Sequence, residues 1–428
     1  MPRSIEPDPN LRAAPGSAAT ELLAQLLEGV ERELPRAVSL RHRLHERPEL
    51  AHAEEWTAEA VANELPVPCT TVARTGRIAW VGPHDPEGNA PVAVRAELDG
   101  LPIEERTGAP FSAKGSAMHA CGHDVHMAAL VALAHAAHTL GEKLPAPLLA
   151  VLQQSEEAYP SGAWELAHGM PADLTRSAPD TPTEMGRGPL AELAPGAIVA
   201  AHIHPELAWG TVALDEGAVN ASCDAVEIVV EGEPTHGAYP HHGADPILAL
   251  AQIVVALHAQ VGRRIDPLHA ATLTVGVLEG GSAENVIPAQ ARARAALRAH
   301  RPEDRQALRT LVQEVAAGVA AAHGCRARVE LTAGEPPLVN HPTIVARARE
   351  LLAGAGFERA PEWRSCGSDD FAFFAELAPI AMAFVGLDGA EGFTRRPLHH
   401  PELLVPDGAV GAVARAQALL YVAAASLE

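Results

Sequence analysis

The sequence has few basic residues: 32 Lys and Arg stand against 54 Asp and Glu, which gives a formal net charge of -22 at pH 7. A protein that binds nucleic acid or an anionic membrane surface needs clustered Lys and Arg. The charge balance therefore argues against both kinds of partner and favours a small-molecule substrate. The five cysteines are odd in number and scattered, which is the pattern of reduced thiols and not of a disulfide framework.

A secretory signal and a long hydrophobic run are also missing. Residues 1–10 are acidic and contain proline, without the basic start and apolar run of a signal peptide, so the cytoplasm is the expected location. The apolar stretch 125–140 contains His126, His135 and His138 and is shorter than the ~20 residues that cross a bilayer. The sequence predicts no transmembrane span.

The chain has 428 residues, 47% of them hydrophobic, which is more than one core usually serves and predicts two domains. In the first part, apolar runs bounded by Gly and Pro alternate with helical patterns, which is typical of a layered α/β domain with helices on both faces of its sheet. The predicted strands are 77–81, 92–97, 148–153 and 197–201, and the predicted helices are 20–50 with a break at Pro35, 57–65 and 126–140. Residues 170–196 predict a surface loop.

The pattern changes after about Ala221. The predicted order is strand 225–231, helix 246–261, strands 271–278 and 291–298, helix 302–322 and strand 326–331. A β-α-β-β-α-β order predicts a compact ferredoxin-like domain, with two helices on one face of a four-stranded sheet. We therefore predict a larger α/β domain, made of residues 18–220 and 333–428, that is interrupted by a smaller domain of residues 221–332.

Potential metal ligands follow several predicted strands or precede a buried helix. Cys121 and His123 lie in the loop before helix 126–140, and Glu156 and Glu157 come directly after strand 148–153. A thiolate and an imidazole at this spacing suit a borderline-soft divalent ion or a shared pair of ions. On extended backbone, adjacent carboxylates point in different directions, so one can bind metal while the other faces a substrate.

Two further clusters contain histidine. The segment Ala201-His202-Ile203-His204-Pro205 comes at the end of strand 197–201, where alternation lets only one of the two histidines point inward, and Leu398-His399-His400-Pro401 lies near the C-terminus. Each cluster alone is more consistent with a capping turn, an acidic loop or a surface turn. Together they favour a metal site, because strand ends of an open α/β sheet converge at one edge.

These residues resemble the dinuclear metallo-amidohydrolases that include hippurate hydrolase, bacterial N-acyl-amino-acid amidohydrolases and plant auxin-conjugate hydrolases. The resemblance spans about Arg41 to Asp407. The motifs that carry it are Arg41-His-Arg-Leu-His-Glu-Arg-Pro-Glu-Leu50, Leu101-Pro-Ile-Glu104, His119-Ala-Cys-Gly-His-Asp124, Glu156-Glu157, Thr235-His-Gly-Ala-Tyr-Pro-His241, Asn285-Val-Ile-Pro288 and Leu398-His-His-Pro401.

The resemblance implies an enzyme with two divalent metal ions per subunit, which Zn, Mn, Co or Ni would suit. It would hydrolyse the amide bond of N-acyl amino acids or similar small amides by a metal-activated water. Cys121 would bridge the metals. The other implied ligands are His123, Glu157, His202 and His399.

The resemblance also gives roles to residues that are not ligands. Glu156 would be the general base, and His236 would stabilise the oxyanion, reaching a partner subunit's site. Asn285 and Arg298 would contact the substrate, and Asp99 would orient a ligand. The smaller domain would be a lid that forms a homodimer.

The sequence leaves some alternatives open. A dipeptidase or carboxypeptidase could use the same metal centre, and a metal-stabilised binding protein could keep the ligands without catalysis. A dinuclear phosphoesterase would need Asp-rich ligands and basic phosphate donors, and neither is evident. The chain also departs from the family pattern: Ala96-Glu97-Leu98-Asp99 replaces the common Ala-Asp-Met-Asp, and Gln153-Gln-Ser155 replaces Gln-Pro-Ala.

Overall fold

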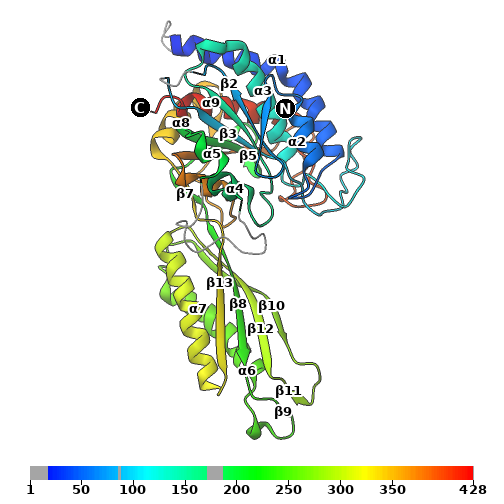
Figure 1. Cartoon of the computed structure of the whole chain (residues 1–428), viewed down its shortest axis with the longest axis vertical. Coiled ribbons are helices and arrows are strands. Elements are labelled where there is room, and N and C mark those ends of the chain that lie inside the picture. Colours follow the sequence, from blue (N-terminus) through cyan, green and yellow to red (C-terminus); the bar gives the residue numbers. More distant parts are fainter. Residues whose placement is uncertain (1–17, 85–87, 171–186, 428) are drawn as a thin grey trace.

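The structure, a computed structural model, describes residues 18–84, 88–170 and 187–427. Its larger domain is built on a mixed sheet of eight strands, and both described ends of the chain lie in this domain (Figure 1). In sheet order the strands are β1 (Cys69–Val72), β2 (Gly76–Val81), β4 (Leu148–Gln153), β3 (Val92–Glu97), β5 (Ala197–Ala208), β16 (Ile380–Asp388), β6 (Thr211–Ala213) and β15 (Glu358–Arg359).

Helices cover both faces of this sheet, as the apolar strands predict. One face packs against α1 (Ala18–Glu46), α2 (Glu55–Ala62), α3 (His123–Leu140), α8 (Pro342–Gly354) and α9 (Gly408–Ala424). The other face packs against α4 (Gly162–His168), α5 (Pro189–Glu192) and the 3-10 helix η4 (Asp370–Glu376). Alternate residues of β3 divide between the two cores: Val92 and Val94 belong to the first, and Ala93 belongs to the second.

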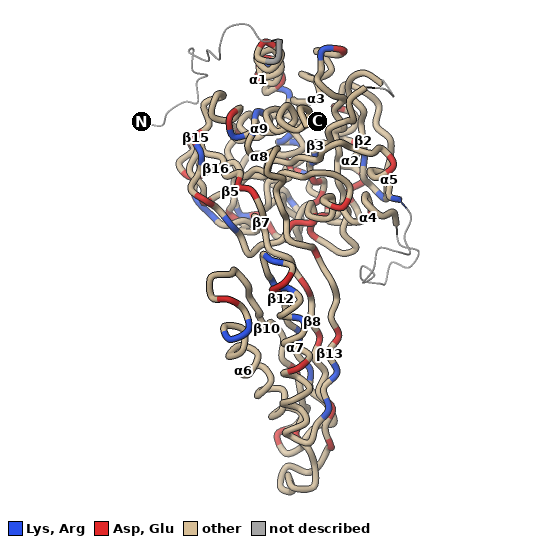
Figure 2. The backbone as a smooth tube through the Cα atoms, turned by 90° about the vertical axis from the view of Figure 1, so that its left-hand side faces the viewer, with Lys and Arg blue, Asp and Glu red and all other residues tan. Residues whose placement is uncertain are grey.

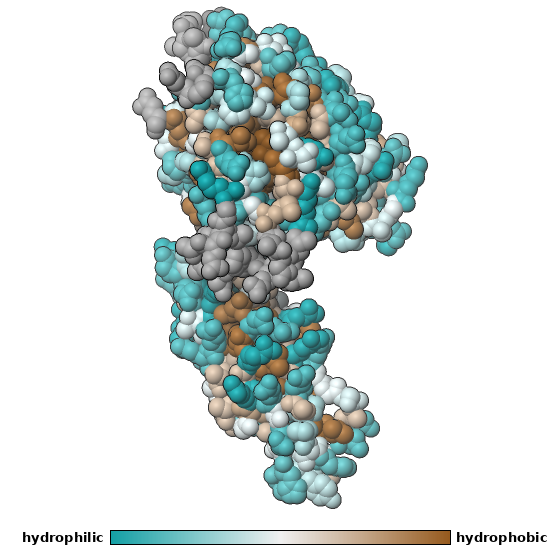
Figure 3. All heavy atoms as spheres, viewed as in Figure 1, coloured by the Kyte–Doolittle hydropathy of each residue, from teal (hydrophilic) through white to brown (hydrophobic). Residues whose placement is uncertain are grey.

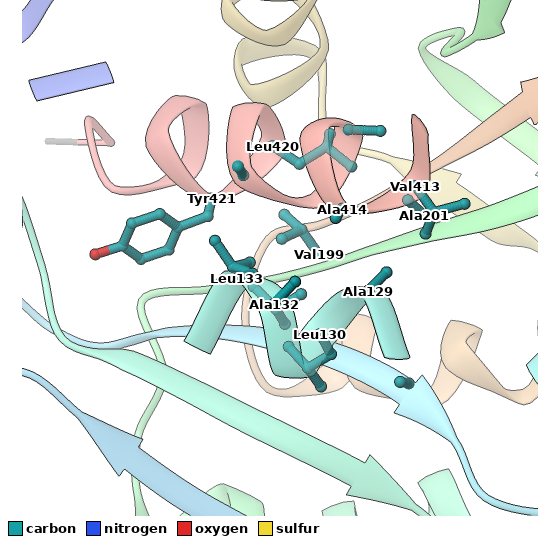
Figure 4. Close-up of a cluster of buried hydrophobic side chains, with 14 of the residues drawn as sticks. Ala129, Leu130, Ala132, Leu133, Val199, Ala201, Val413, Ala414, Leu420 and Tyr421 are labelled. Atoms are coloured by element: carbon teal, nitrogen blue, oxygen red, sulfur yellow. The ribbon is translucent and has the colours of Figure 1, made fainter. Parts of the chain in front are cut away.

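The interior of the larger domain fixes the start of α3, where Cys121 and His123 lie. Figure 4 shows Leu130 and Leu133 of α3 in one cluster with Val199 of β5 and Leu420 of α9. All four side chains are fully buried. Burial of a Leu or Val side chain contributes about 1.5–3 kcal/mol, so this cluster holds α3 firmly on the sheet.

The smaller domain extends from the larger one as an elongated body (Figure 1). Its antiparallel sheet has the order β10 (Ala271–Gly280), β12 (Gln290–Ala299), β8 (Ser222–Glu231) and β13 (Arg326–Ala333). The helices α6 (Pro246–Arg264) and α7 (Pro302–Ala322) share a buried core with this sheet. The β-α-β-β-α-β order and the fold class are thus confirmed.

Shorter elements complete both domains. β9 (Thr235–His236) and β11 (Val286–Ile287) form a two-stranded ribbon at the far tip of the smaller domain, next to η3 (Pro240–His242) (Figure 1). β7 (Gly217–Asn220) pairs with β14 (Leu338–Asn340) where the chain passes between the domains, and η1 (Gly141–Lys143) follows α3.

Two local predictions are wrong. Pro35 does not break α1, which continues through it from Ala18 to Glu46. Leu26 and Val30 before the proline and Leu40 after it are all buried in one core, so packing on both sides outweighs the hydrogen bond that proline lacks. β5 is also longer than predicted, so His202 and His204 lie inside the strand and not after it. Of the predicted loop 170–196, residues 171–186 lie outside the described residues, and the rest contains α5.

The surface is mixed in charge and in hydropathy. Figure 2 shows acidic and basic residues interspersed along both domains, and Figure 3 shows hydrophobic residues that reach the surface along the smaller domain. Among the helices of the described ranges, α6 alone is long and apolar enough to span a membrane by length and composition. Its Ile253 and Leu257 are buried in the core of the smaller domain.

Candidate metal centre

The start of α3 meets β5 at very close range. Gly122 has φ +82°, and a Cβ there would lie 2.7 Å from Cγ1 of Ile203, so only glycine fits between the two elements. This contact brings Sγ of Cys121 to 3.5 Å from Nε2 of His202, and both side chains are buried. The Cys-Gly-His sequence therefore places a thiol and an imidazole against a histidine of the neighbouring strand.

The turn after β4 brings two carboxylates to the same edge of the sheet. The Ser155 N–H donates to the Glu54 carboxylate at 2.8 Å, and the Glu157 N–H donates to the Asp99 carboxylate at 2.9 Å. With the turn fixed in this way, Oε2 of Glu156 lies 3.9 Å from Nε2 of His123. Ligand atoms of Cys121, His123 and Glu157 lie within 4.8 Å of one another.

His399 reaches the centre from the C-terminal part of the chain. The backbone N–H of His399 donates to the carbonyl of Ala120 at 2.8 Å, and Nε2 of its ring lies 3.1 Å from Oε1 of Glu157. The structure thus brings together Cys121, His123, Glu156, Glu157, His202 and His399, which come from four separate stretches of sequence.

Asp99, the predicted orienting residue, lies at this centre, whereas the three predicted residues of the smaller domain lie elsewhere. His236 and Asn285 are exposed on the ribbon at the tip of the smaller domain, where the Gly237 N–H donates to the Asn285 carbonyl at 2.7 Å. Figure 1 shows this ribbon at the end of the molecule opposite the larger domain. Arg298 lies at the base of the smaller domain and donates to the carbonyl of Cys366 at 2.9 Å. Within one chain, His236 is therefore remote from Cys121.

The chemistry of the buried atoms fits divalent cations. Nδ1 of His123 lies 2.9 Å from the carbonyl oxygen of Asp99 and donates to it, which leaves Nε2 as the ring nitrogen that would face a cation once its own proton is released. That Nε2 is buried and has no hydrogen-bond partner, and Oε1 of Glu157 is buried without a hydrogen bond although Nε2 of His399 lies 3.1 Å from it. Buried polar atoms seldom lack a partner, and a bound cation would satisfy both.

The electrostatics of the centre also favour a cation. Burial, the charge of Glu157 and the charge of Glu156 all raise the pKa of Cys121. Burial would lower the pKa of His123, but the charge of Glu97 and a hydrogen bond to Asp99 raise it to about 10. Without metal, protons therefore occupy groups that must be deprotonated as ligands, so metal binding is expected to release protons.

A buried polar network behind the centre was missed by the sequence prediction. Arg95 donates to Gln153 at 2.8 Å and to Asp369 and Asp370 at 2.9 Å, and it also pairs with Glu97. The signal was an arginine in the middle of an otherwise apolar strand, since a buried arginine requires carboxylate partners.

A second buried network connects α1 to the start of α3. Asp124 accepts from Nε of Arg41 at 2.9 Å and lies 3.0 Å from Nδ1 of His45. Arg41 also donates to the carbonyl of Val405 at 2.6 Å. Burial would lower the pKa of His45, but the charge of Asp124 and hydrogen bonds to Asp124 and Glu105 raise it to about 9.

The raised pKa of His45 predicts a loss of stability at alkaline pH. The protonated ring stabilises the folded state fully below pH ~6.5, and this contribution of up to about 3 kcal/mol is lost as the pH rises through about 9. The melting temperature of the wild type should therefore fall more steeply between pH 6.5 and 9 than that of His45→Gln. Parallel melting profiles for the two proteins would contradict a charged His45.

Comparison with known proteins places this centre in a family. The model of peptidase family M20/M25/M40 matches residues 93–420. The N-acetyl-L-cysteine deacetylase of Bacillus subtilis is 32% identical over 389 residues, which cover 90% of this chain and 86% of the relative. An N-acetyldiaminopimelate deacetylase from Geobacillus thermodenitrificans is 33% identical over 386 residues, which cover 87% and 93% of the two chains.

A plant enzyme and a solved structure agree with these matches. An IAA-amino acid hydrolase from Arabidopsis thaliana is 32% identical over 390 residues, covering 87% of this chain and 82% of the relative. A dinuclear metal-binding peptidase of the M20 family from Bacillus subtilis superposes with a TM-score of 0.76 at 28% identity, over 92% of this chain and 98% of that chain. The resemblance seen in the motifs is confirmed, and the chain belongs to peptidase family M20/M25/M40.

Proposed function

We propose that this amide-hydrolysing enzyme cleaves N-acyl amino acids, or similar small amides, into a carboxylic acid and an amino acid. The observation that carries the proposal is the pair Glu156 and Glu157. Glu157 lies among the potential ligands, whereas Glu156 lies beside them as an additional carboxylate. A purely structural metal site has no need of a second carboxylate in that position.

The named relatives support the substrate class. Three of the similar proteins are named as deacetylases of N-acetyl-L-cysteine and of N-acetyldiaminopimelate, and as a hydrolase of an IAA-amino acid. In each of these names an acyl group is attached to an amino acid. A substrate of the same class is therefore the one we propose for this chain, with the acyl group and the amino acid left to experiment.

We propose that Cys121, His123, His202, Glu157 and His399 would hold two divalent ions, with His202 serving one ion and Glu157 and His399 the other, and with zinc, manganese, cobalt and nickel as candidates. Bound there, two such ions would lower the pKa of a water and polarise the amide carbonyl. Glu156 takes the proton of that water and delivers it to the leaving amine. Burial and the charges of Glu157 and Asp369 raise the pKa of Glu156, in the direction that suits a base near neutral pH.

We also propose a homodimer formed through the smaller domain and a cytoplasmic location. α6 exposes Leu248 at 50% and Val255 at 65%, and β10 is an edge strand of its sheet with Leu278 exposed at 57%. Exposed apolar side chains beside an unpaired strand edge suit contact with a second copy. Five free cysteines suit a reducing compartment.

The proposal is tested with metal-reconstituted protein and two matched substrate panels, N-acyl amino acids and unblocked dipeptides. We expect release of the amino acid from the acylated panel, and loss of this activity after metal removal with recovery on adding metal back. Turnover of the dipeptides alone would assign the chain as a dipeptidase. Two bound metals without turnover of either panel would contradict the proposed function.

A further inference from the structure

Two buried residues behind the metal centre, Glu97 and His126, form a connected pair. Oε2 of Glu97 lies 2.9 Å from Nδ1 of His126, and Nε2 of His126 accepts from the N–H of Ile203 at 3.1 Å. Since Nε2 accepts, the proton of the neutral ring is on Nδ1 and is donated to Glu97. The pair thus connects the last residue of β3, through α3, to the backbone of β5.

This connection ends beside a proposed ligand. Ile203 follows His202 in β5, and the rings of His126 and His202 meet at 4.5 Å between centroids with an interplanar angle of 60°. His202 is therefore held on two sides, by the neighbouring ring and by the hydrogen bond to the next peptide unit. Its Nε2 faces Cys121 at 3.5 Å in this arrangement.

Glu97 is itself fixed from behind. Its Oε1 pairs with Arg95, which is fully buried and also donates to Asp369 and Asp370. Glu97, His123, His126 and His202 could by proximity hold a cation of their own. However, both carboxylate oxygens of Glu97 and both ring nitrogens of His126 already have partners. These two residues therefore act on the ligands and are not ligands themselves.

We propose that Glu97 and His126 are positioning residues that hold β5 against the start of α3, so that His202 faces Cys121 and one of the two cations binds tightly. The inference rests on the proposed function, because it takes His202 as a ligand of one ion. It concerns only that ion. The hydrogen bonds of Glu97 and His126 go to each other, to Arg95 and to Ile203, and not to Glu157 or His399. The affinity of the ion assigned to Glu157 and His399 should therefore not depend on Glu97 or His126.

The test is titration of metal-free protein with Co²⁺, followed by visible spectroscopy and by metal analysis after dialysis. Wild type should bind two ions. Glu97→Gln should bind one ion as wild type does and the other on the order of 10- to 100-fold more weakly, as expected when a partner that orients a ligand is lost. His126→Phe, which keeps a ring against His202 but removes both hydrogen bonds, should give the same loss.

Asp224→Asn is the matched control, because Asp224 is a buried carboxylate paired with an arginine, Arg305, in the smaller domain. It should bind both ions as wild type does. Unchanged affinities in folded Glu97→Gln and His126→Phe would overturn the inference, and so would equal weakening of both ions. Failure of both variants to fold while Asp224→Asn folds would overturn it as well, since the pair would then serve the whole fold. If wild type itself did not bind two ions, the proposed function would fail instead.

Discussion

Glu156→Gln is expected to reduce kcat by on the order of 10²- to 10⁴-fold, because the amide cannot take a proton from the attacking water or deliver it to the leaving amine. The substitution keeps the size of the side chain. Glu156 lies outside the cluster of Cys121, His123 and Glu157 and groups with Asp369 and Asp370 instead, so the metal content of the proposed centre should stay at the wild-type level. Steady-state kinetics on the best N-acyl amino acid, with metal analysis of the same samples, measures both quantities.

The neighbouring residue provides a matched control. Glu157→Gln makes the same chemical change one position along the chain, but it removes a carboxylate that lies 3.1 Å from His399 and close to Cys121. We expect this variant to lose metal and, with it, activity that added metal partly restores. If Glu156→Gln lost metal in the same way, or if it kept wild-type turnover, Glu156 would not be the base.

Much of the fold could be predicted because Gly and Pro punctuate the sequence. β3, β4 and α7 begin and end where the pattern of apolar residues and prolines places them. β5 was predicted too short because its second half, from His202 onward, mixes histidine with apolar residues and lacks a continuous apolar run. The continuity of α1 through Pro35 depends on a tertiary core that no local pattern contains.

The metal centre could likewise be predicted only in part from the sequence. Cys121, His123, Glu156 and Glu157 are dense in sequence and chemically distinctive, so they could be selected once the clusters were considered together. Arg95 and Asp369 are 274 positions apart and meet only through the folded sheet. Networks of this kind cannot be predicted from local motifs, although the buried charge in β3 was a signal that a partner must exist.

The second large effect concerns His236, which the structure places on the exposed ribbon at the tip of the smaller domain. We expect His236→Ala to lower kcat by on the order of 10²- to 10³-fold, the usual cost of removing an oxyanion donor. The metal content should stay unchanged, because His236 is remote from Cys121 in its own chain. His242→Ala is the matched control, since His242 is exposed in the same loop, and it should keep its activity.

If His236 serves the partner's site in a dimer, two inactive variants should complement each other. A mixed dimer of His236→Ala and Glu156→Gln has one site with an intact base from the first subunit and an intact histidine from the second. Random mixing of equal amounts should therefore restore roughly a quarter of the wild-type activity, because half of the dimers are mixed and each has one working site. Activity of the mixture, compared with each variant alone, measures this.

A variant on the surface of α6 tests whether His236 acts at the partner's site or at the site of its own chain. Val255→Glu places a charge on an apolar residue that is 65% exposed, and it should produce a monomer in light scattering that is as inactive as His236→Ala. If the monomer kept its activity, or if mixed dimers formed without recovery, His236 would have to reach the centre of its own chain by a movement of the smaller domain. The tip ribbon would then act in cis, and the dimer would serve only stability.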